Sequence, residues 1–131
     1  MKVFERNTTV SQNVMQILEE HHAPISIIQV MKKLHKKDLT PNKSTLYRIF
    51  DKLKEKKVVS EMVLKNGITY YEIKSNHHHH HFLCELCDTV YCLTSCHSDT
   101  LTFDIEELIP NKNFNVNYHE FTLYGQCDLC R

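Results

Sequence analysis

Apolar residues recur at helical spacing three times within the first 55 residues. Each set places its members on one face of a helix of 3.6 residues per turn. Ser26 and Asn42 stand just before the second and third sets and are the expected N-caps. The pattern therefore predicts three short amphipathic helices. The three sets are Val10, Val14, Ile17 and Leu18; Ile27, Val30, Met31 and Leu34; and Leu46, Ile49, Phe50 and Leu53.

Two β-rich runs follow the third helix, at residues 58–65 and 68–73. The dipeptide Asn66-Gly67 joins them, and this pair is the strongest short signal for a two-residue hairpin turn. Three short helices followed by a hairpin is the order of elements in a winged helix-turn-helix domain.

The pattern changes after Ser75. Short apolar runs at 89–93 and 114–124 predict strands, and a helix is expected near 100–109, where Pro110 ends it. The predicted fold class is α+β, with a winged helix-turn-helix domain at residues 1–75 and a small α/β domain at residues 76–131. Domains as small as the second usually need a metal, a disulfide or a partner subunit to hold their fold.

The charge supports this division. The whole chain has 16 basic and 16 acidic side chains, a formal net charge of zero. Residues 1–75 carry 14 basic and 8 acidic side chains, a net of +6, whereas residues 76–131 carry 2 and 8, a net of −6. Between Lys32 and Lys57 the sequence has ten basic residues and only three acidic ones. Such a cluster is either a solvated helical face or a surface for a phosphate backbone.

The helical context favours double-stranded DNA as the partner. A helix-turn-helix places the start of its last helix in the major groove. There Ser44 and Thr45 can donate to phosphates, beside the positive charge of Lys43. Tyr47 offers a ring to a thymine methyl, and Arg48 a bidentate fork to a guanine edge. Burial of Tyr47 in the core is the alternative, although this residue lies off the apolar stripe.

Composition excludes other classes. No stretch approaches 18 consecutive apolar residues, so no membrane partner is expected. The first residues lack the apolar core of a signal peptide, which favours a cytoplasmic location. Thiols stay reduced there, so the six cysteines are expected to bind metal or to act in redox chemistry rather than to form disulfides.

Four of these cysteines form two C-x-x-C pairs, Cys84 with Cys87 and Cys127 with Cys130. Spacing of this kind lets both thiolates of a pair reach one tetrahedral ion, and two pairs make a closed site suited to structural zinc. A redox pair of the thioredoxin type is the competing interpretation, but no βαβ unit surrounds the cysteines.

Five consecutive histidines, residues 77–81, end three positions before Cys84. In an extended chain alternate side chains point to opposite faces, so His79 and His81, with His77 as a further candidate, would face one way and His78 and His80 the other. The run could then serve two metal sites, or remain a solvated loop. Other candidate ligands are Glu72, Cys92, Cys96, His97, Asp99, His119 and His22.

Taken together, the motifs resemble the ferric uptake regulator superfamily of bacterial metal-sensing repressors. The residues that carry the resemblance are Ser44-Thr45-Leu46-Tyr47-Arg48, Tyr70-Tyr71-Glu72, His77–His81-Phe82-Leu83-Cys84-x-x-Cys87, and His119 followed by Cys127-x-x-Cys130. The resemblance implies a C-terminal dimerisation domain and a homodimer. It also implies that the metal-loaded form represses metal-uptake genes from a palindromic operator.

The resemblance also implies a role for each matching position. Tyr47 and Arg48 match the DNA-reading pair. The matching sets are a structural zinc site of Cys84, Cys87, Cys127 and Cys130; a regulatory site of Glu72, His79, His81 and Cys92; and an additional site of His78, His80, Asp99 and His119.

The chain departs from the family pattern at three places. Asp88 follows the first cysteine pair where the family often has glycine. Residues 56–58 lack the glycine that often precedes the wing, the hairpin predicted at residues 58–73. His21 and His22 lie further from Ser26 than the family's regulatory histidine does.

A thiolate ligand at Cys92 favours zinc, because iron(II) and manganese(II) prefer nitrogen and oxygen donors. The expected regulatory metal is therefore Zn²⁺. Fe²⁺ is the alternative, and peroxide, manganese or nickel sensing are lesser ones. No catalytic zinc motif is present, so an enzyme is not expected. A zinc storage protein or metallochaperone would use the same His and Cys but would need neither the basic half nor Tyr47 and Arg48.

Overall fold

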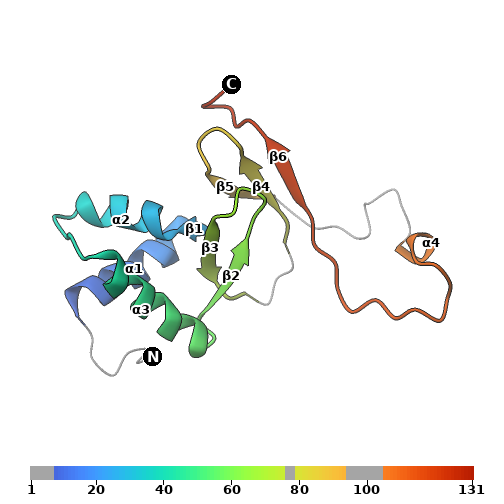
Figure 1. Cartoon of the computed structure of the whole chain (residues 1–131), viewed down its shortest axis with the longest axis horizontal. Coiled ribbons are helices and arrows are strands. Elements are labelled where there is room, and N and C mark those ends of the chain that lie inside the picture. The colour runs from blue at the N-terminus through green and yellow to red at the C-terminus, as the bar shows by residue number, and fades with distance from the viewer. Residues whose placement is uncertain (1–7, 76–78, 94–104) are drawn as a thin grey trace.

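The computed structural model describes residues 8–75, 79–93 and 105–131, and it confirms the predicted α+β class. Its N-terminal half has three helices and a three-stranded antiparallel sheet in the order β1-β3-β2, as expected for a winged helix (Figure 1). The elements are α1 (Thr9–His21), β1 (Ile25–Ser26), α2 (Ile27–His35), α3 (Lys43–Glu55), β2 (Val59–Val63) and β3 (Thr69–Ile73).

Both predicted caps are present. Ser26 accepts a hydrogen bond from the backbone of Gln29 while the Gln29 side chain accepts one from the Ser26 backbone, which completes a capping box. Asn42 accepts a hydrogen bond from the backbone N–H of Thr45 at 2.9 Å and another from the Ser44 hydroxyl. The caps satisfy the backbone N–H groups of Gln29 and Thr45, which have no partner within their own helices, and they fix where α2 and α3 begin.

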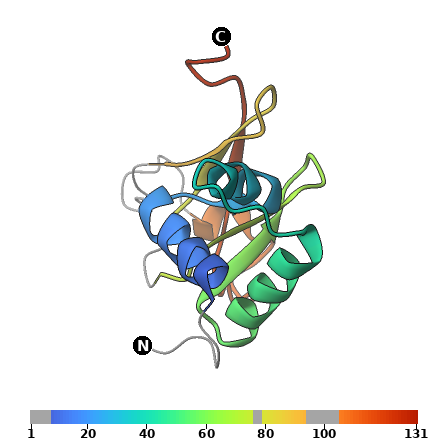
Figure 2. The ribbon, with the colours of Figure 1, turned by 90° about the vertical axis from the view of Figure 1, so that its left-hand side faces the viewer.

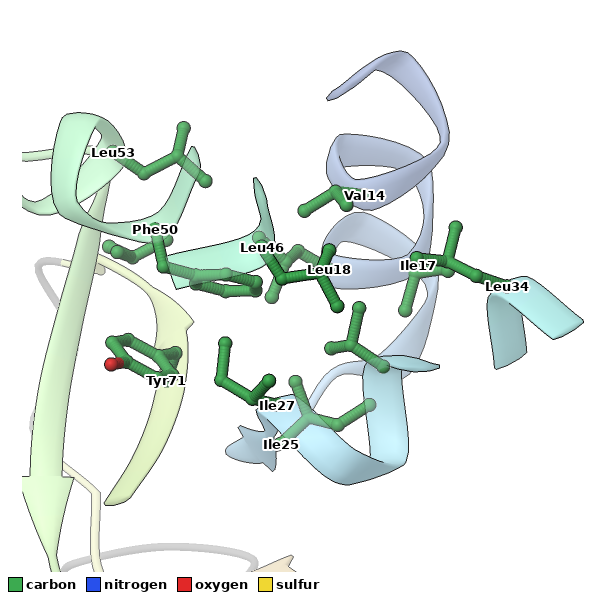
Figure 3. Packing of buried hydrophobic residues seen from close by; sticks show 12 residues of the cluster. Val14, Ile17, Leu18, Ile25, Ile27, Leu34, Leu46, Phe50, Leu53 and Tyr71 are labelled. Atoms are coloured by element: carbon green, nitrogen blue, oxygen red, sulfur yellow. The ribbon is translucent and has the colours of Figure 1, made fainter. Parts of the chain in front are cut away.

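The predicted apolar faces meet in one core, shown in Figure 3. The ring of Phe50 from α3 packs against Tyr71 from β3 with 4.6 Å between the ring centroids. The helices are therefore fixed to the sheet as well as to one another. The buried members are Val14, Ile17, Leu18, Ile25, Ile27, Val30, Leu34, Leu46, Phe50, Leu53, Val59 and Tyr71.

The C-terminal half contains a second three-stranded sheet in the order β5-β4-β6. Strand β4 pairs antiparallel with β5 and parallel with β6. The elements of this half are β4 (His81–Cys84), β5 (Val90–Cys92), α4 (Ile105–Leu108) and β6 (Thr122–Gly125). The strand expected at 89–93 is thus confirmed in its centre.

The prediction of a strand over 114–124 is wrong for most of its length, because β6 begins only at Thr122. Phe114, Val116 and Tyr118 are all exposed. No neighbouring strand in the described part of the chain pairs with residues 114–121, so the apolar pattern there does not form a strand. Figure 1 shows α4 and this segment extending away from the rest of the molecule.

The two halves also share a small core. Tyr70 of the wing is fully buried against Leu83 and Val90 of the second sheet. Seen from the helical side, the three N-terminal helices lie in front of the strands (Figure 2). None of the described helices is long and apolar enough to cross a membrane.

Candidate metal centres and DNA interface

The parallel pairing of β4 with β6 brings the two cysteine pairs together. Cys84 is opposite Gly125 in the register, so the chain beyond each strand turns at the same edge of the sheet. The four Sγ atoms of Cys84, Cys87, Cys127 and Cys130 all lie within 4.8 Å of one another. Sulfurs bound at about 2.3 Å to one tetrahedral ion lie about 3.8 Å apart. The Sγ atoms of Cys87 and Cys127 are 3.9 Å apart, which fits this geometry.

The surroundings of the cysteine site lower the pKa of two of its thiols, Cys84 and Cys127. Backbone N–H groups of Cys127 and Cys87 hydrogen-bond to Cys84 and lower the pKa of this buried thiol to about 6. The Tyr91 hydroxyl donates to the Cys127 sulfur, which lowers the pKa of Cys127 and raises that of Tyr91 to about 12. Contacts with Cys127 and Cys87 raise the pKa of Cys130 to about 12, so this thiol would ionise only on binding metal. Four sulfurs at one position are a donor set suited to zinc.

Spacing along the chain did not reveal Tyr91 as part of this site. Tyr91 is opposite Phe82 in the β4–β5 register, and its position depends on that pairing. No local pattern in the sequence signals such a contact.

A second cluster contains Glu72, His79, His81 and Cys92, whose ligand atoms also lie within 4.8 Å of one another. Glu72 comes from β3, whereas His81 and Cys92 are direct partners in the β4–β5 register. His79 lies two residues before His81. The cluster therefore takes ligands from both sheets, and it brings together all four residues of the predicted regulatory site.

Two observations show that this second cluster suits a cation. Nε2 of His81 is buried, lacks a hydrogen-bond partner among the described residues, and lies 3.6 Å from Glu72 Oε1. Burial raises the pKa of Glu72, but contacts with His81 and His79 outweigh it and hold the pKa below its ordinary value. A carboxylate and an unsatisfied imidazole nitrogen thus point at one position.

Cys92 completes the cluster from β5. Burial and the charge of Glu72 raise the pKa of its thiol, and its Sγ lies 3.6 Å from the backbone carbonyl of His22, to which it donates. His22 and Glu19 line a cleft of about 410 Å³ that also touches Glu72 and His79. The exposed side chain of His22 is not part of the 4.8 Å cluster.

The additional site is only partly described. His80 faces away from the regulatory cluster, is buried, and stacks on Phe121 with 3.9 Å between ring centroids. Its Nδ1 accepts a hydrogen bond from the Phe121 backbone, and the ring of His119 lies 5.1 Å away. Two further predicted ligands of this site, His78 and Asp99, and the candidates His77, Cys96 and His97 lie outside the described residues.

The predicted DNA-reading residues occupy the first two turns of α3. Leu46 and Phe50 point into the core and Ile49 packs against it, whereas Tyr47 and Arg48 face outward. Tyr47 is 48% exposed and therefore is not a core aromatic. Lys43, Ser44 and Arg48 are exposed as well, and Thr45 is half-buried. The arrangement leaves an outward-facing polar surface at the start of this helix.

Comparison with known proteins gives consistent results. The model of a family described as the ferric uptake regulator family matches residues 4–124. The ferric uptake regulation protein of Bacillus subtilis (strain 168) is 28% identical over 121 residues, covering 89% of this chain and 78% of that protein.

Two solved structures share the fold. The ferric uptake regulator from Francisella tularensis, solved with iron, has a TM-score of 0.75 at 20% identity, covering 99% of this chain and 98% of that one. A zinc-bound manganese uptake regulator has a TM-score of 0.77 at 22% identity, covering 93% and 90%. Because the family model spans nearly the whole sequence, the chain belongs to the ferric uptake regulator family.

Proposed function

We propose that this protein is a zinc-responsive transcriptional repressor that acts as a homodimer on a palindromic operator and controls zinc uptake. The family comprises metal-responsive transcription regulators, not enzymes. The finer points of the proposal are the metal, the oligomer and the operator, and each is supported by a different feature of the chain.

The observation that carries the choice of metal is the donor set of the second cluster. Glu72, His79, His81 and Cys92 supply one oxygen, two nitrogens and one sulfur at a single position. Four donors with a thiolate among them suit tetrahedral zinc. Iron(II) and manganese(II) favour harder ligands, so the thiol of Cys92 separates this proposal from an iron-responsive one.

The four cysteines are proposed to hold a structural zinc ion. They join the turn after β4 to the last residues of the chain, so this site would close the small C-terminal half on itself. Binding energy at such a site becomes folding energy. The additional site of His78, His80, Asp99 and His119 remains a proposal from the sequence.

Regulation would depend on the position of the second cluster between the two proposed domains, 1–75 and 76–131. Glu72 belongs to the base of the wing, and the other three ligands belong to the C-terminal half. Zinc would supply a positive charge that draws these donors together. The reading helix α3 would then be held at a defined place relative to its partner's helix, roughly 34 Å away, which matches successive major grooves. A metal shifts such an equilibrium only by its different affinities for the two arrangements.

The proposed homodimer is supported by the exposed apolar residues of the C-terminal half. Leu108, Phe114, Val116 and Tyr118 are exposed, and their segment pairs with no strand in the described part of this chain. A large exposed apolar surface usually marks a protein interface. A second copy of the chain would cover it.

Operator binding under defined metals tests the proposal. Purified protein would first be analysed for metal, and its affinity for a candidate palindromic operator would then be measured at fixed salt with zinc, iron(II) or manganese(II). Zinc alone should raise the affinity strongly. Unchanged affinity with zinc would contradict the proposal, and a response to iron(II) only would favour an iron sensor. A storage protein would bind zinc without binding DNA.

A further inference from the structure

The turn that carries Cys84 and Cys87 is hydrogen-bonded directly to the DNA-binding half. The hydroxyl of Tyr70, in β3, donates to the backbone carbonyl of Asp88 at 2.7 Å. The side chain of Gln29, in α2, donates to the same carbonyl at 3.4 Å. One backbone oxygen beside a cysteine ligand thus receives hydrogen bonds from both the wing and the second helix.

The side chain of Asp88 makes a further link. Its Oδ1 accepts a hydrogen bond from Asn66 Nδ2 at 3.2 Å, and the same amide donates to the Tyr70 hydroxyl at 3.0 Å. Asn66 belongs to the turn of the wing, where its own Oδ1 accepts from the backbone of Ile68. The wing turn, the wing strand and the cysteine turn therefore form one closed hydrogen-bond network.

The conformation of Asp88 depends on the cysteine turn. Its backbone N–H donates to the Cys84 carbonyl at 2.9 Å, and its φ is +59°, in the left-handed region that favours glycine. Glycine would relieve this strain, but it would lack the carboxylate that meets Asn66. The strained backbone and the interdomain contact occur at the same residue.

Apolar packing lies beneath the polar network. Tyr70 is buried against Leu83 and Val90, and three wing residues, Met62, Leu64 and Ile68, pack around them. The packing brings the two halves together without fixing their orientation, since apolar contact is not directional. The hydrogen bonds at Asp88 supply the directional part.

From this arrangement we propose that Asp88 is an interdomain latch, through which the four-cysteine site positions the wing and α2. Metal binding at the four cysteines and docking of the DNA-binding half onto the cysteine turn are then coupled. Coupling of this kind is reciprocal: a metal that favours the docked state is itself bound more firmly when the half is docked. The inference rests on the proposed function only in taking the four cysteines to be a zinc site.

An exchange of side chains tests the latch. Asn66→Asp places two carboxylates opposite each other but keeps the oxygen that caps Ile68. Asp88→Asn keeps a side-chain oxygen that can accept from Asn66 Nδ2 and suits the left-handed backbone, so alone it removes only the charge of the acceptor. The double variant restores a carboxylate facing an amide, with donor and acceptor exchanged. Each protein would be studied at full length, loaded with zinc and without DNA.

Two measurements would follow the latch: the rate of zinc release to a chromogenic chelator, and hydrogen exchange of the wing amides at residues 62–70. Asn66→Asp should speed both by on the order of two- to tenfold, the range set by one net hydrogen bond. Asp88→Asn should change both rates much less, because its amide oxygen still accepts from Asn66. The double variant, in which the new amide donates to the new carboxylate, should recover the part of the loss that arises between positions 66 and 88. A purely local destabilisation would not be rescued in this way.

A second pair of variants gives a matched control. Tyr70→Phe removes only the hydroxyl that reaches Asp88, whereas Tyr71→Phe makes the same change on the next residue, whose ring packs on Phe50 of α3. Only Tyr70→Phe should speed zinc release. Equal rates for both variants, or no recovery in the exchanged double variant, would overturn the latch. Absence of zinc from the wild-type protein would instead contradict the proposed function. Hydrogen exchange would still decide whether the hydrogen bonds at Asp88 hold the wing against the cysteine turn.

Discussion

Nε2 of His79 lies 3.0 Å from the carboxylate of Glu72, although Glu72 belongs to β3 of the first sheet and His79 lies two residues before β4 of the second. Beside them, the rings of His79 and His81 meet edge to face with 4.9 Å between centroids. The side chains that would bind a regulatory ion thus come from both halves of the molecule and lie within reach of one position. Metal binding there would link the two halves.

Replacing Cys92 with serine is expected to abolish zinc-dependent operator binding while leaving the dimer intact. A serine hydroxyl does not ionise near neutral pH and is a poor zinc ligand, so zinc affinity at this site should fall about a hundredfold or more. Fluorescence anisotropy of a labelled operator in zinc buffers would measure the loss. His22→Ala is the control, because its ring lines the same cleft outside the ligand cluster. A normal zinc response from Cys92→Ser would remove Cys92 from the site.

Zinc binding at the regulatory cluster should release protons and strengthen with rising pH. The raised pKa of Cys92 means that its thiol is protonated at neutral pH and must ionise to bind. Below that pKa, the contribution of Cys92 should raise the affinity about tenfold per pH unit. Glu72 contributes no proton, since its pKa is lowered and it is already ionised.

Calorimetry in buffers of different ionisation enthalpy would count the protons released on zinc binding. Cys92→Ser should release about one fewer than the wild type. An equal count in the two proteins would show that Cys92 does not bind the metal.

Cys84→Ser should act differently, by destabilising the C-terminal half. Cys84 is buried at the end of β4 and forms one edge of the four-sulfur cluster. Loss of a structural metal belongs to the largest single-residue effects, about 4 kcal/mol or more. Thermal unfolding and analytical ultracentrifugation would reveal a lower midpoint and a weaker dimer. An unchanged midpoint would argue that the cysteines hold no structural metal.

On the DNA side, Arg48→Ala and Lys43→Ala should have distinguishable effects. A bidentate contact from Arg48 to guanine should be worth about 1–3 kcal/mol, and its loss should relax the preference for one base pair. Lys43 would contact phosphate, so its loss should weaken binding to all sequences alike and reduce the salt dependence by about one counterion. Titrations at several salt concentrations, on operator and mutated operator, separate the two. Identical salt slopes and base preferences would contradict these roles.

Short-range patterns predicted most of the elements. Apolar periodicity placed the buried faces of α1, α2 and α3, and Asn42 capped α3 as expected. Alternation along an extended chain predicted that His79 and His81 would share a side, with His80 on the other. These successes depend on geometry within a few residues of chain.

The remaining features depend on pairing between segments far apart in the sequence, which local patterns do not predict. Both the hydrogen bond from Tyr91 to Cys127 and that from Tyr70 to Asp88 arise where distant strands meet, and neither leaves a local signal. The prediction of a strand at 114–124 was wrong for a related reason. An apolar pattern indicates that a segment packs against other residues, but it does not show which segment or chain supplies them. Positive φ at Lys57 and Asp88 does not show in the residue types themselves, since neither is a glycine; the one pointer was that the family often has glycine at these places.

Lys57 offers a test of that last point. It follows α3 with φ of +60°, its N–H donates to the Lys54 carbonyl, and the next N–H, of Val58, donates to the Leu53 carbonyl. This pair of bonds is a Schellman motif, whose left-handed position favours glycine. Lys57→Gly should therefore raise the free energy of unfolding by about 1 kcal/mol, after allowing for the added freedom of the unfolded chain.

The neighbouring residue provides the control for Lys57→Gly. Lys56 has φ of −82°, which any residue adopts, so Lys56→Gly relieves no strain in the folded state. Glycine also gives the unfolded chain more conformational freedom, which favours unfolding. It should lower the free energy of unfolding by about 0.5–1 kcal/mol. Urea denaturation of both variants measures the difference. Because the two changes remove the same charge one residue apart, equal shifts would show that charge rather than backbone conformation governs stability at this helix end.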